Sequence, residues 1–272
     1  MNFIDLIKYI FLGIVQGITE PIPVSSSGHL LIFQKLIGSM DIDFEMLAII
    51  TNFGSLLAII FIFKKDIIEL FKGFFGYLSK KEKKYYNDYK YSLMVVLATI
   101  PAGIMGLVIT KLDLFDFLEE NVKFVGVTLL ITALFLFLIK DLKGSKKDSE
   151  ITYKNALIIG LFQVLALVPG ISRSGSTIVG GMKEKLTREA AFKFSFILYI
   201  PISIATMILG VKDLIEASPS FELMTYYFMS FLASLVVTYF SAQWFRDIIK
   251  KGKLIYFVGY CLVAGILVIL FL

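Results

Sequence analysis

The sequence contains little charge for its length. Of its 272 residues, 18% are Asp, Glu, Lys or Arg and 57% are hydrophobic, whereas an average soluble domain is about 25% charged. Several long runs carry almost no charge, and each approaches the roughly 20 residues that a helix needs to cross the hydrocarbon core of a membrane. The low charge therefore argues against a soluble domain and predicts an integral membrane protein.

Cysteine and histidine are almost absent. Cys261 is the single cysteine, so the chain has no internal disulfide, and its apolar neighbours in the sequence predict a packing role. His29 is the single histidine, which argues against a zinc site of the His/Cys type. The chain also lacks the Gly-Lys-Ser/Thr end of a P-loop, which argues against ATP hydrolysis, and it lacks the alternating pattern of barrel strands.

Ten apolar segments predict helices. The first segment contains Gln16 and Glu20 and is followed by no small-residue cleavage site, so we expect no cleavable signal peptide. Six segments are long enough for full spans: Phe44–Phe63, Tyr91–Ile109, Val122–Ile139, Ala190–Val211, Phe221–Gln243 and Leu254–Leu272. Four segments are shorter or interrupted: Phe3–Glu20, Val24–Ile37, Asn155–Val168 and Ile171–Met182.

The four short segments form two pairs, each joined by a proline-containing stretch, Pro21-Ile22-Pro23 and Pro169-Gly170. Proline cannot continue a helix, and it disfavours the helical conformation of the residue before it. Segments of this length are too short to span a membrane alone. We therefore predict two re-entrant helical hairpins, each with its broken backbone buried in protein.

The two hairpins are related in sequence. A shift of 147 positions places Gly13 on Gly160 without a gap. The same shift places residues 24–28, Val-Ser-Ser-Ser-Gly, on residues 171–175, Ile-Ser-Arg-Ser-Gly. Because both a helix and the loop after it match, the pattern predicts an internal repeat.

The positive charge lies mainly in four connections. By the positive-inside rule these are cytoplasmic: Lys64–Lys90, Lys140–Lys154, Lys183–Lys193 and Arg246–Lys253. The connections that alternate with them are acidic on balance and carry Asp41, Asp43, Glu45, Asp113, Asp116, Glu119, Glu120, Asp213, Glu216 and Glu222. Three crossings in each half then invert the second repeat, place both termini outside, and bring the first hairpin in from outside.

The predicted fold is an all-α polytopic membrane protein. A single integral membrane domain covers 1–272, with two inverted-topology repeats, 1–140 and 151–272, each a re-entrant hairpin plus three transmembrane helices. Inverted repeats with broken helices place a binding site near the membrane interior, where the hairpin tips meet. The net charge of +5 belongs to loops that flank the membrane, so no nucleic-acid partner is expected. The oligomeric state stays open, a homodimer included.

Polar side chains are costly inside a membrane, and here they gather on the hairpins. The short helices begin near Gly28 and Gly175, and free N–H groups at a helix start favour an anion. Arg173 adds a planar cation that suits phosphate oxygens. The set comprises Gln16, Glu20, Ser25, Ser26, Ser27 and His29 on one hairpin and Ser172, Arg173, Ser174, Ser176 and Thr177 on the other.

The charge of Glu20 does not suit simple anion binding. A carboxylate beside phosphates indicates a bound divalent cation or a general base. His29 could shuttle a proton, and a serine next to a base could attack phosphorus. The set therefore favours phosphoryl transfer or hydrolysis. Structural interpretations compete with each role: Ser25 as a helix cap, Arg173 as an ion-pair partner of Glu20, and His29 as a helix-packing residue.

Three stretches resemble the undecaprenyl-diphosphate phosphatase family, also called bacitracin-resistance proteins. The first is Gln16-Gly-Ile-Thr-Glu20, the second Pro23-Val-Ser-Ser-Ser-Gly-His29, and the third Pro169-Gly-Ile-Ser-Arg-Ser-Gly-Ser-Thr177. They occur in the family's order and at its separation, and the resemblance extends through Phe192–Pro201 to cover essentially the whole chain. Gln16 stands where many members of the family have Glu, which questions any mechanism that needs two carboxylates on this helix.

The resemblance implies a hydrolase of the bacterial plasma membrane, surrounded by membrane lipids. It would release phosphate from a C55 polyprenyl diphosphate with Mg²⁺ or Ca²⁺, recycle the lipid carrier for cell-wall synthesis and confer bacitracin resistance. The resemblance gives Glu20 the role of metal ligand or base, Ser26 that of nucleophile or phosphate ligand, His29 that of proton carrier, and Arg173 that of diphosphate ligand. The residues expected to line the diphosphate site are Gln16, Ser25, Ser27, Ser172, Ser174 and Thr177.

A transporter or flippase for a lipid phosphate or another anion is the alternative function. Inverted repeats and hairpins at the membrane midplane are features of transporters, and a fold does not fix a function. Glu20 and His29 beside the serines are the features that favour chemistry over transport.

Overall fold

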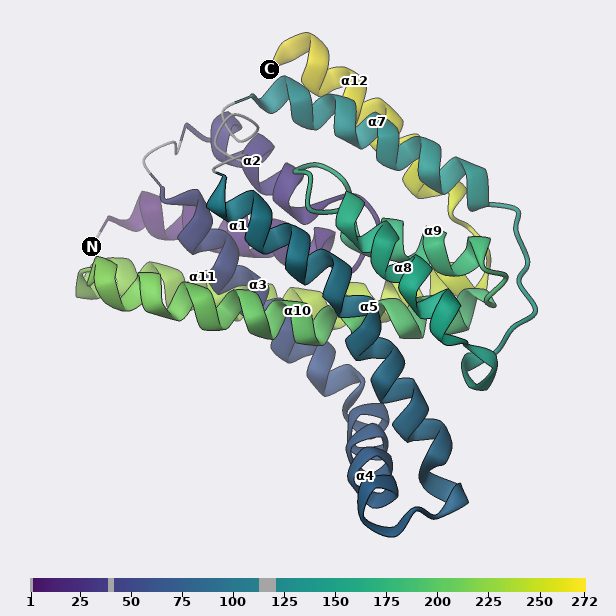
Figure 1. Cartoon of the computed structure of the whole chain (residues 1–272). Helices are drawn as coiled ribbons and strands as arrows, with labels where there is room; N and C mark the ends of the chain where they lie inside the picture. Colours follow the sequence, from purple (N-terminus) through teal and green to yellow (C-terminus); the bar gives the residue numbers. More distant parts are fainter. Residues whose placement is uncertain (1, 39–41, 113–120) are drawn as a thin grey trace.

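The computed structural model describes residues 2–38, 42–112 and 121–272, and it is built of helices (Figure 1). Five of the helices that it describes are long and apolar enough to cross a membrane, which agrees with a polytopic membrane protein. The elements are α1 (Phe3–Thr19), α2 (Ser26–Leu36), α3 (Phe44–Ile62), α4 (Lys64–Lys80), α5 (Tyr86–Lys111), α7 (Val122–Ile139), α8 (Tyr153–Leu165), α9 (Arg173–Lys183), α10 (Arg188–Ala217), α11 (Phe221–Lys250) and α12 (Ile255–Phe271).

The short helices break where the prolines predicted a break. α1 ends at Thr19, before Pro21, and α2 begins at Ser26; α8 ends at Leu165 and α9 begins at Arg173. Within each pair the two helices pack against each other. α12 has 17 residues and spans about 26 Å at the α-helical rise, so it falls just short of the length expected for a full span.

The connection 64–90 is not a loop, which corrects the sequence interpretation. Its first part is α4, and α4 packs along the start of α5, where Phe74 and Tyr77 lie on Tyr89 with ring centroids 5.5 and 4.7 Å apart. The many lysines of this stretch favoured a loop in the sequence interpretation. Its apolar residues nevertheless recur every three to four positions, as they do in an amphipathic helix. The turn after α4 is made by Lys81 in a left-handed conformation, with φ 55°.

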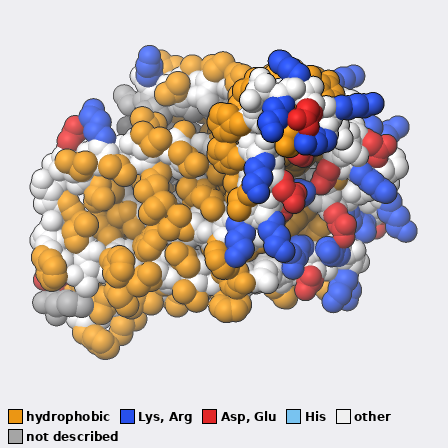
Figure 2. All heavy atoms as spheres, turned by 90° about the horizontal axis from the view of Figure 1, so that it is seen from below, with side chains coloured by type: hydrophobic (Ala, Val, Ile, Leu, Met, Phe, Trp, Pro, Cys, Tyr) orange, Lys and Arg blue, Asp and Glu red, His pale blue; other side chains and the backbone are white. Residues whose placement is uncertain are grey.

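Charge is distributed unevenly over the molecule. Both chain ends lie on the side away from α4 (Figure 1). Lys and Arg side chains gather at one end of the face in Figure 2, and much of the remaining face is apolar. Of the acidic residues predicted to lie in connections, Asp41 and those at 113–120 lie outside the described residues, whereas Asp43 caps the start of α3 and Glu45 lies in its first turn.

Two glycines that match across the repeat make the same kind of contact. A Cβ added to Gly13 would lie 2.9 Å from the backbone carbonyl carbon of Ser230 in α11. A Cβ added to Gly160 would lie 2.9 Å from the Cα of Ala98 in α5. Each glycine thus lets the backbone of a hairpin helix approach the backbone of a long helix from the other half of the chain, as small residues do in membrane helix pairs.

We expect Gly13→Ala and Gly160→Ala to lower the thermal unfolding temperature in detergent, because the added methyl group meets backbone that cannot move aside cheaply. Overpacking of this kind costs about 1–3 kcal/mol. Gly103→Ala in α5 is the matched control, since nothing lies within 4 Å of the added Cβ and alanine favours the helix by about 1 kcal/mol. Equal melting temperatures for Gly13→Ala and Gly103→Ala would contradict this account of the packing.

Candidate functional site

The broken loops of the two hairpins meet in the interior of the molecule. A Cβ on Gly28 would lie 3.1 Å from Gly170, and a Cβ on Gly175 would lie 3.3 Å from Pro23. Ser174 Oγ also donates to the carbonyl oxygen of Ile22 across 3.3 Å. The starts of α2 and α9, far apart in the sequence, therefore lie beside each other.

Serines cap both helix starts. Ser25 Oγ accepts the N–H of Gly28 at 3.3 Å, and Ser172 Oγ accepts the N–H of Gly175 at 3.1 Å, so the capping role considered for Ser25 is present. Ser25 has φ 69°, and a residue other than glycine in this left-handed region costs about 1–3 kcal/mol. Such strain persists where the surroundings fix the backbone, as they do here between the two loops.

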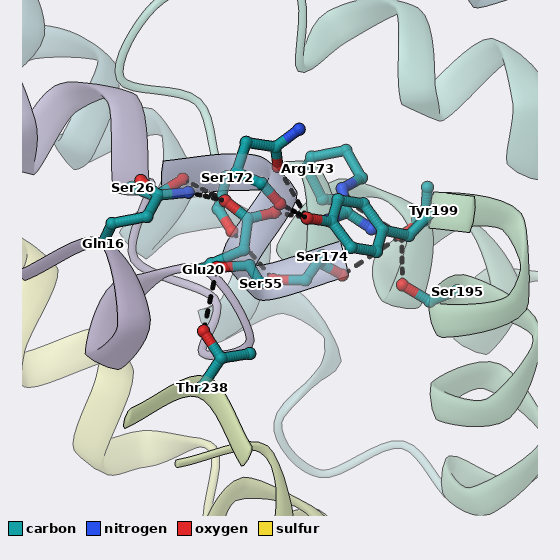
Figure 3. A network of polar contacts seen from close by, with 12 residues as sticks. Gln16, Glu20, Ser26, Ser55, Ser172, Arg173, Ser174, Ser195, Tyr199 and Thr238 are labelled. Carbon is teal, nitrogen blue, oxygen red and sulfur yellow. Dashed lines mark hydrogen bonds and ion pairs between the residues drawn. The ribbon is translucent and has the colours of Figure 1, made fainter. Parts of the chain in front are cut away.

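Glu20 is the centre of the polar network in Figure 3. Its Oε1 accepts a hydrogen bond from Arg173 Nη2 at 2.5 Å, while its Oε2 accepts one from Ser26 Oγ at 2.5 Å and one from Gln16 Nε2 at 3.0 Å. The side chains of Glu20 and Arg173 are 11% and 18% exposed. The tertiary structure thus gathers residues from three separate stretches of sequence around one carboxylate.

A small cavity of about 80 Å³ opens beside this network. Glu20 and Arg173 contribute to its wall from opposite hairpins, so the opposite charges that the sequence placed 153 positions apart face the same space. The residues that line it are Thr19, Glu20, Ser25, Ser26, Ser27, Ala166, Ile171, Ser172, Arg173 and Ser174.

Three of the expected site residues do not line this cavity, and one of them, Gln16, contacts the site through its hydrogen bond to Glu20. His29 is buried and points to α12, where Nε2 lies 2.7 Å from the hydroxyl of Tyr260 and Nδ1 lies 2.7 Å from the carbonyl oxygen of Ser25. Thr177 is fully buried and its hydroxyl lies 2.6 Å from Ser195 Oγ in α10. Both side chains hold the hairpins against neighbouring helices, and His29 also holds the Ser25 turn.

Tyr199 of α10 is a functional candidate that the sequence interpretation missed. Its ring lies under the Arg173 guanidinium, with Cζ 3.9 Å from the ring centroid. Its hydroxyl donates to Asn52 Oδ1 in α3 at 2.6 Å. In the sequence Tyr199 is one aromatic residue in a long apolar run, which is typical of lipid contact, and only the fold places it beneath a cation.

The residues around Glu20 offer few ligands for a resident metal ion. Within the described residues no group of three or more His, Cys, Asp or Glu could hold one. Glu20 is the single carboxylate in the cavity wall, and both its oxygens already accept hydrogen bonds. Mg²⁺ in phosphoryl-transfer sites is commonly held by one or two carboxylates together with substrate phosphates and waters. The wall could therefore hold a divalent cation only together with a phosphate group.

The comparisons with known proteins all relate the sequence to one protein family. The family model described as "Bacitracin resistance protein BacA" matches residues 9–267. The chain is 45% identical to undecaprenyl-diphosphatase 1 of Bacillus licheniformis, with 100% of both chains covered. It is 41% identical to undecaprenyl-diphosphatase 1 of Bacillus cereus, covering 100% of this chain and 99% of that one. It is 40% identical to undecaprenyl-diphosphatase of Oceanobacillus iheyensis, covering 100% and 98%.

Proposed function

The chain belongs to the bacitracin resistance protein family, and we propose that it hydrolyses undecaprenyl diphosphate to undecaprenyl phosphate and inorganic phosphate. The product is the lipid carrier of cell-wall synthesis, so this activity recycles the carrier and confers bacitracin resistance. The observation that supports the proposal best is the meeting of Glu20, Ser26 and Arg173 at the two hairpin loops. A base, a hydroxyl and a phosphate-binding cation are the groups that such a hydrolysis needs.

Ser26 is the proposed nucleophile and Glu20 its base. The Ser26 hydroxyl donates to Glu20 Oε2 at 2.5 Å, which is the contact expected between a nucleophile and its base. Ser26 Oγ attacks the terminal phosphorus, its proton passes to Glu20, and undecaprenyl phosphate leaves as the phosphoric anhydride bond breaks. Undecaprenyl phosphate takes that proton from Glu20 as it leaves, so the carboxylate is ionised again. Glu20 then takes a proton from a water molecule that attacks the phosphoserine, and returns it to Ser26 Oγ as the P–O bond breaks and inorganic phosphate leaves.

Arg173 is the proposed ligand of the diphosphate. Its guanidinium pairs with Glu20 at 2.5 Å and rests on the Tyr199 ring. A phosphate group that enters the cavity offers Arg173 a second anionic partner, and the planar guanidinium suits its oxygens. Substrate would thus draw Arg173 away from Glu20, and this would raise the basicity of the carboxylate when Ser26 needs it. The serines of the wall, Ser25, Ser27, Ser172 and Ser174, supply further donors to phosphate oxygens.

A divalent cation, Mg²⁺ or Ca²⁺, is the proposed cofactor, with Glu20 as its protein ligand. When bound, such an ion neutralises charge on the phosphate oxygens as they are transferred. Gln16 lies beside Glu20 and would keep its amide donor on the carboxylate. Because Gln16 adds no negative charge, Glu20 and the substrate would bind the ion together.

We propose that the two repeats have inverted topology. α1 packs on α11 while α8 packs on α5, so each hairpin lies against a long helix of the other repeat. α3 packs on α10, and α7 packs on α12. This exchange of partners, together with the matching glycine contacts of Gly13 and Gly160, is what two halves related by a pseudo-twofold axis would give.

The proposed orientation places both termini and the opening of the site outside the cell. It can be tested with single cysteines at Ser145 and Ser218, both exposed and on opposite sides of the membrane in this scheme. The native Cys261 is fully buried and should stay unlabelled. An impermeant maleimide added to whole cells should label Ser218→Cys and leave Ser145→Cys unmodified. The reverse pattern would overturn the orientation.

The test of the proposed function is phosphate release from undecaprenyl diphosphate by purified protein with Mg²⁺ or Ca²⁺. Release should stop on chelation of the metal and return when it is restored. Movement of the lipid across vesicles without phosphate release would support the transporter alternative instead. Trapping a phosphorylated Ser26 during turnover would support serine attack, whereas ¹⁸O transfer from water without a phosphoenzyme would support direct attack by water.

Tyr199→Leu should raise KM for the diphosphate by about 5- to 30-fold with a smaller change in kcat, because a shielded cation–π contact contributes roughly 1–2 kcal/mol. Tyr199→Phe keeps the ring under Arg173 and loses only the hydroxyl bond to Asn52, so its KM should stay within about threefold of the parent. Steady-state kinetics distinguish the two variants. A Tyr199→Phe variant as impaired as Tyr199→Leu would show that the ring does not position Arg173.

A further inference from the structure

A second cavity lies at the basic end of the molecule. Its volume is about 780 Å³, and it is bounded by the end of α3, the connection from α7 to α8, the start of α10 and the end of α11. None of the residues that line it lines the Glu20 cavity. The second cavity is therefore a separate feature, and the hydrolysis proposed above makes no use of it.

The rim of this cavity is strongly cationic. Six Lys or Arg side chains contribute to the lining, against the two acidic side chains of Asp148 and Glu189. Both acids already have lysine partners: Lys193 lies 3.3 Å from Asp148, and Lys250 lies 3.4 Å from Glu189. Within the described part of the chain, no carboxylate lies at ion-pair distance from the other four cations, which are Lys143, Lys147, Arg188 and Arg246.

Arg188 is held in place with part of its hydrogen-bonding capacity unused. One guanidinium nitrogen donates to the carbonyl oxygen of Lys140 at 3.1 Å, while its buried Nε has no partner in the structure. Gly252, with φ 69°, leaves room for this guanidinium, because a Cβ there would lie 2.7 Å from Arg188 Cζ. Arg188 is thus fixed in place beside three more cations that have no carboxylate partner. This arrangement is typical of an anion-binding site, whereas the side chains of a solvated surface are free to move.

The back wall of the cavity is apolar. Phe63, Phe192 and Ile249 are 7%, 4% and 1% exposed, and the rings of Phe63 and Phe192 lie 6.2 Å apart. A free inorganic ion makes no favourable contact with an apolar wall. A phospholipid, in contrast, carries an anionic group for the cations and an apolar chain for the wall. Basic pockets between helices at the membrane edge are where lipid headgroups bind.

We propose that this cavity binds a phosphate group, carried by an anionic membrane lipid or free in solution, as a site distinct from the catalytic cavity. The cations of the rim neutralise the phosphate, and Arg188 offers it a planar set of donors. The apolar wall accommodates the first part of a lipid chain.

The test compares two triple variants that each remove three exposed cations. Lys143→Gln/Lys147→Gln/Arg246→Gln removes three exposed positive charges from the rim. It leaves the partly buried Arg188 in place, so we expect folding to be preserved. Lys80→Gln/Lys81→Gln/Lys83→Gln is the matched control, at the end of α4 and in the connection from α4 to α5, away from the cavity. Thermal unfolding of each protein in neutral detergent is measured with dioctanoyl phosphatidylglycerol, with dioctanoyl phosphatidylcholine and with inorganic phosphate.

Phosphatidylglycerol should raise the unfolding temperature of the parent and of the control by about 5 °C at saturation, and it should raise that of the rim variant by less than half as much. Phosphatidylcholine should have no effect that depends on the variant. The same pattern with inorganic phosphate alone would identify free phosphate as the source. Equal shifts in the three proteins with every probe, or no shift in the parent, would overturn the proposal. None of these outcomes depends on hydrolysis of the diphosphate.

Discussion

Arg173→Ala should abolish nearly all phosphate release from undecaprenyl diphosphate, with kcat/KM falling by about 10³-fold or more. The guanidinium is the one cationic side chain in the wall of the Glu20 cavity, and cationic donors that neutralise a transferring phosphoryl group contribute about 10³–10⁵ in rate. Arg173→Lys keeps a charge but loses the planar donors and the stacking on Tyr199, so it should recover only part of the activity. Phosphate release by purified variants measures both effects.

The Arg173→Ala variant has a second consequence that must be separated from the first. It leaves Glu20, which is 11% exposed, without its cationic partner, and a carboxylate left unpaired in this way destabilises the fold. The double variant Arg173→Ala/Glu20→Ala removes both charges and should regain much of the lost thermal stability while staying inactive. If the double variant were as unstable as the single one, the ion pair would not be the cause of the instability. Full activity of Arg173→Ala would remove the role proposed for the arginine.

Glu20→Gln should lower kcat by about 10²–10⁴-fold, the range that a general base contributes. The amide keeps nearly the same shape but has one acceptor oxygen in place of two, so it loses the negative charge, the basicity and one of the two accepting positions that Arg173 and Ser26 use. Because Glu20 is also the proposed metal ligand, the concentration of Mg²⁺ needed for half-maximal residual activity should rise. A titration of activity against Mg²⁺ measures both changes.

Gln16→Ala is the matched control for Glu20→Gln. It removes the amide that donates to Glu20 Oε2 at 3.0 Å, but it leaves the carboxylate and its contact with Ser26. Its activity should fall by no more than about 10- to 150-fold, since a single hydrogen bond to a charged group contributes about 1.5–3 kcal/mol at most. A loss of activity in Gln16→Ala as large as that in Glu20→Gln would show that the loss in Glu20→Gln does not come from the missing carboxylate charge alone.

Much of the site could be predicted from the sequence because the chemistry is concentrated in two matching loops. A carboxylate, a histidine, an arginine and several serines in an apolar setting are costly, and the repeat predicts that both loops serve one site. The prolines at 21, 23 and 169 determine where the hairpins break. The low charge alone is enough to predict a membrane protein.

Contacts across the fold could not be predicted in this way. Glu20 and Ser26 lie six positions apart on either side of a broken backbone, and the turn that brings Oε2 to within 2.5 Å of Oγ has no periodicity to reveal it. His29 follows one turn later on the same helix, yet it bonds Tyr260 of α12 outside the cavity wall. Sequence proximity therefore grouped His29 with the site, whereas the packing of α12 placed it behind the Ser25 turn.

The sequence by itself determined the membrane class, the broken hairpins and the kind of chemistry, because these depend on composition, on proline and on residue types within a few positions of one another. The tertiary structure alone decided which of the polar residues touch. It put Tyr199 beneath Arg173 and packed α4 along the start of α5. It also built the basic cavity from four separate segments. Each of these depends on side chains that are remote in sequence and are brought together only when the helices pack.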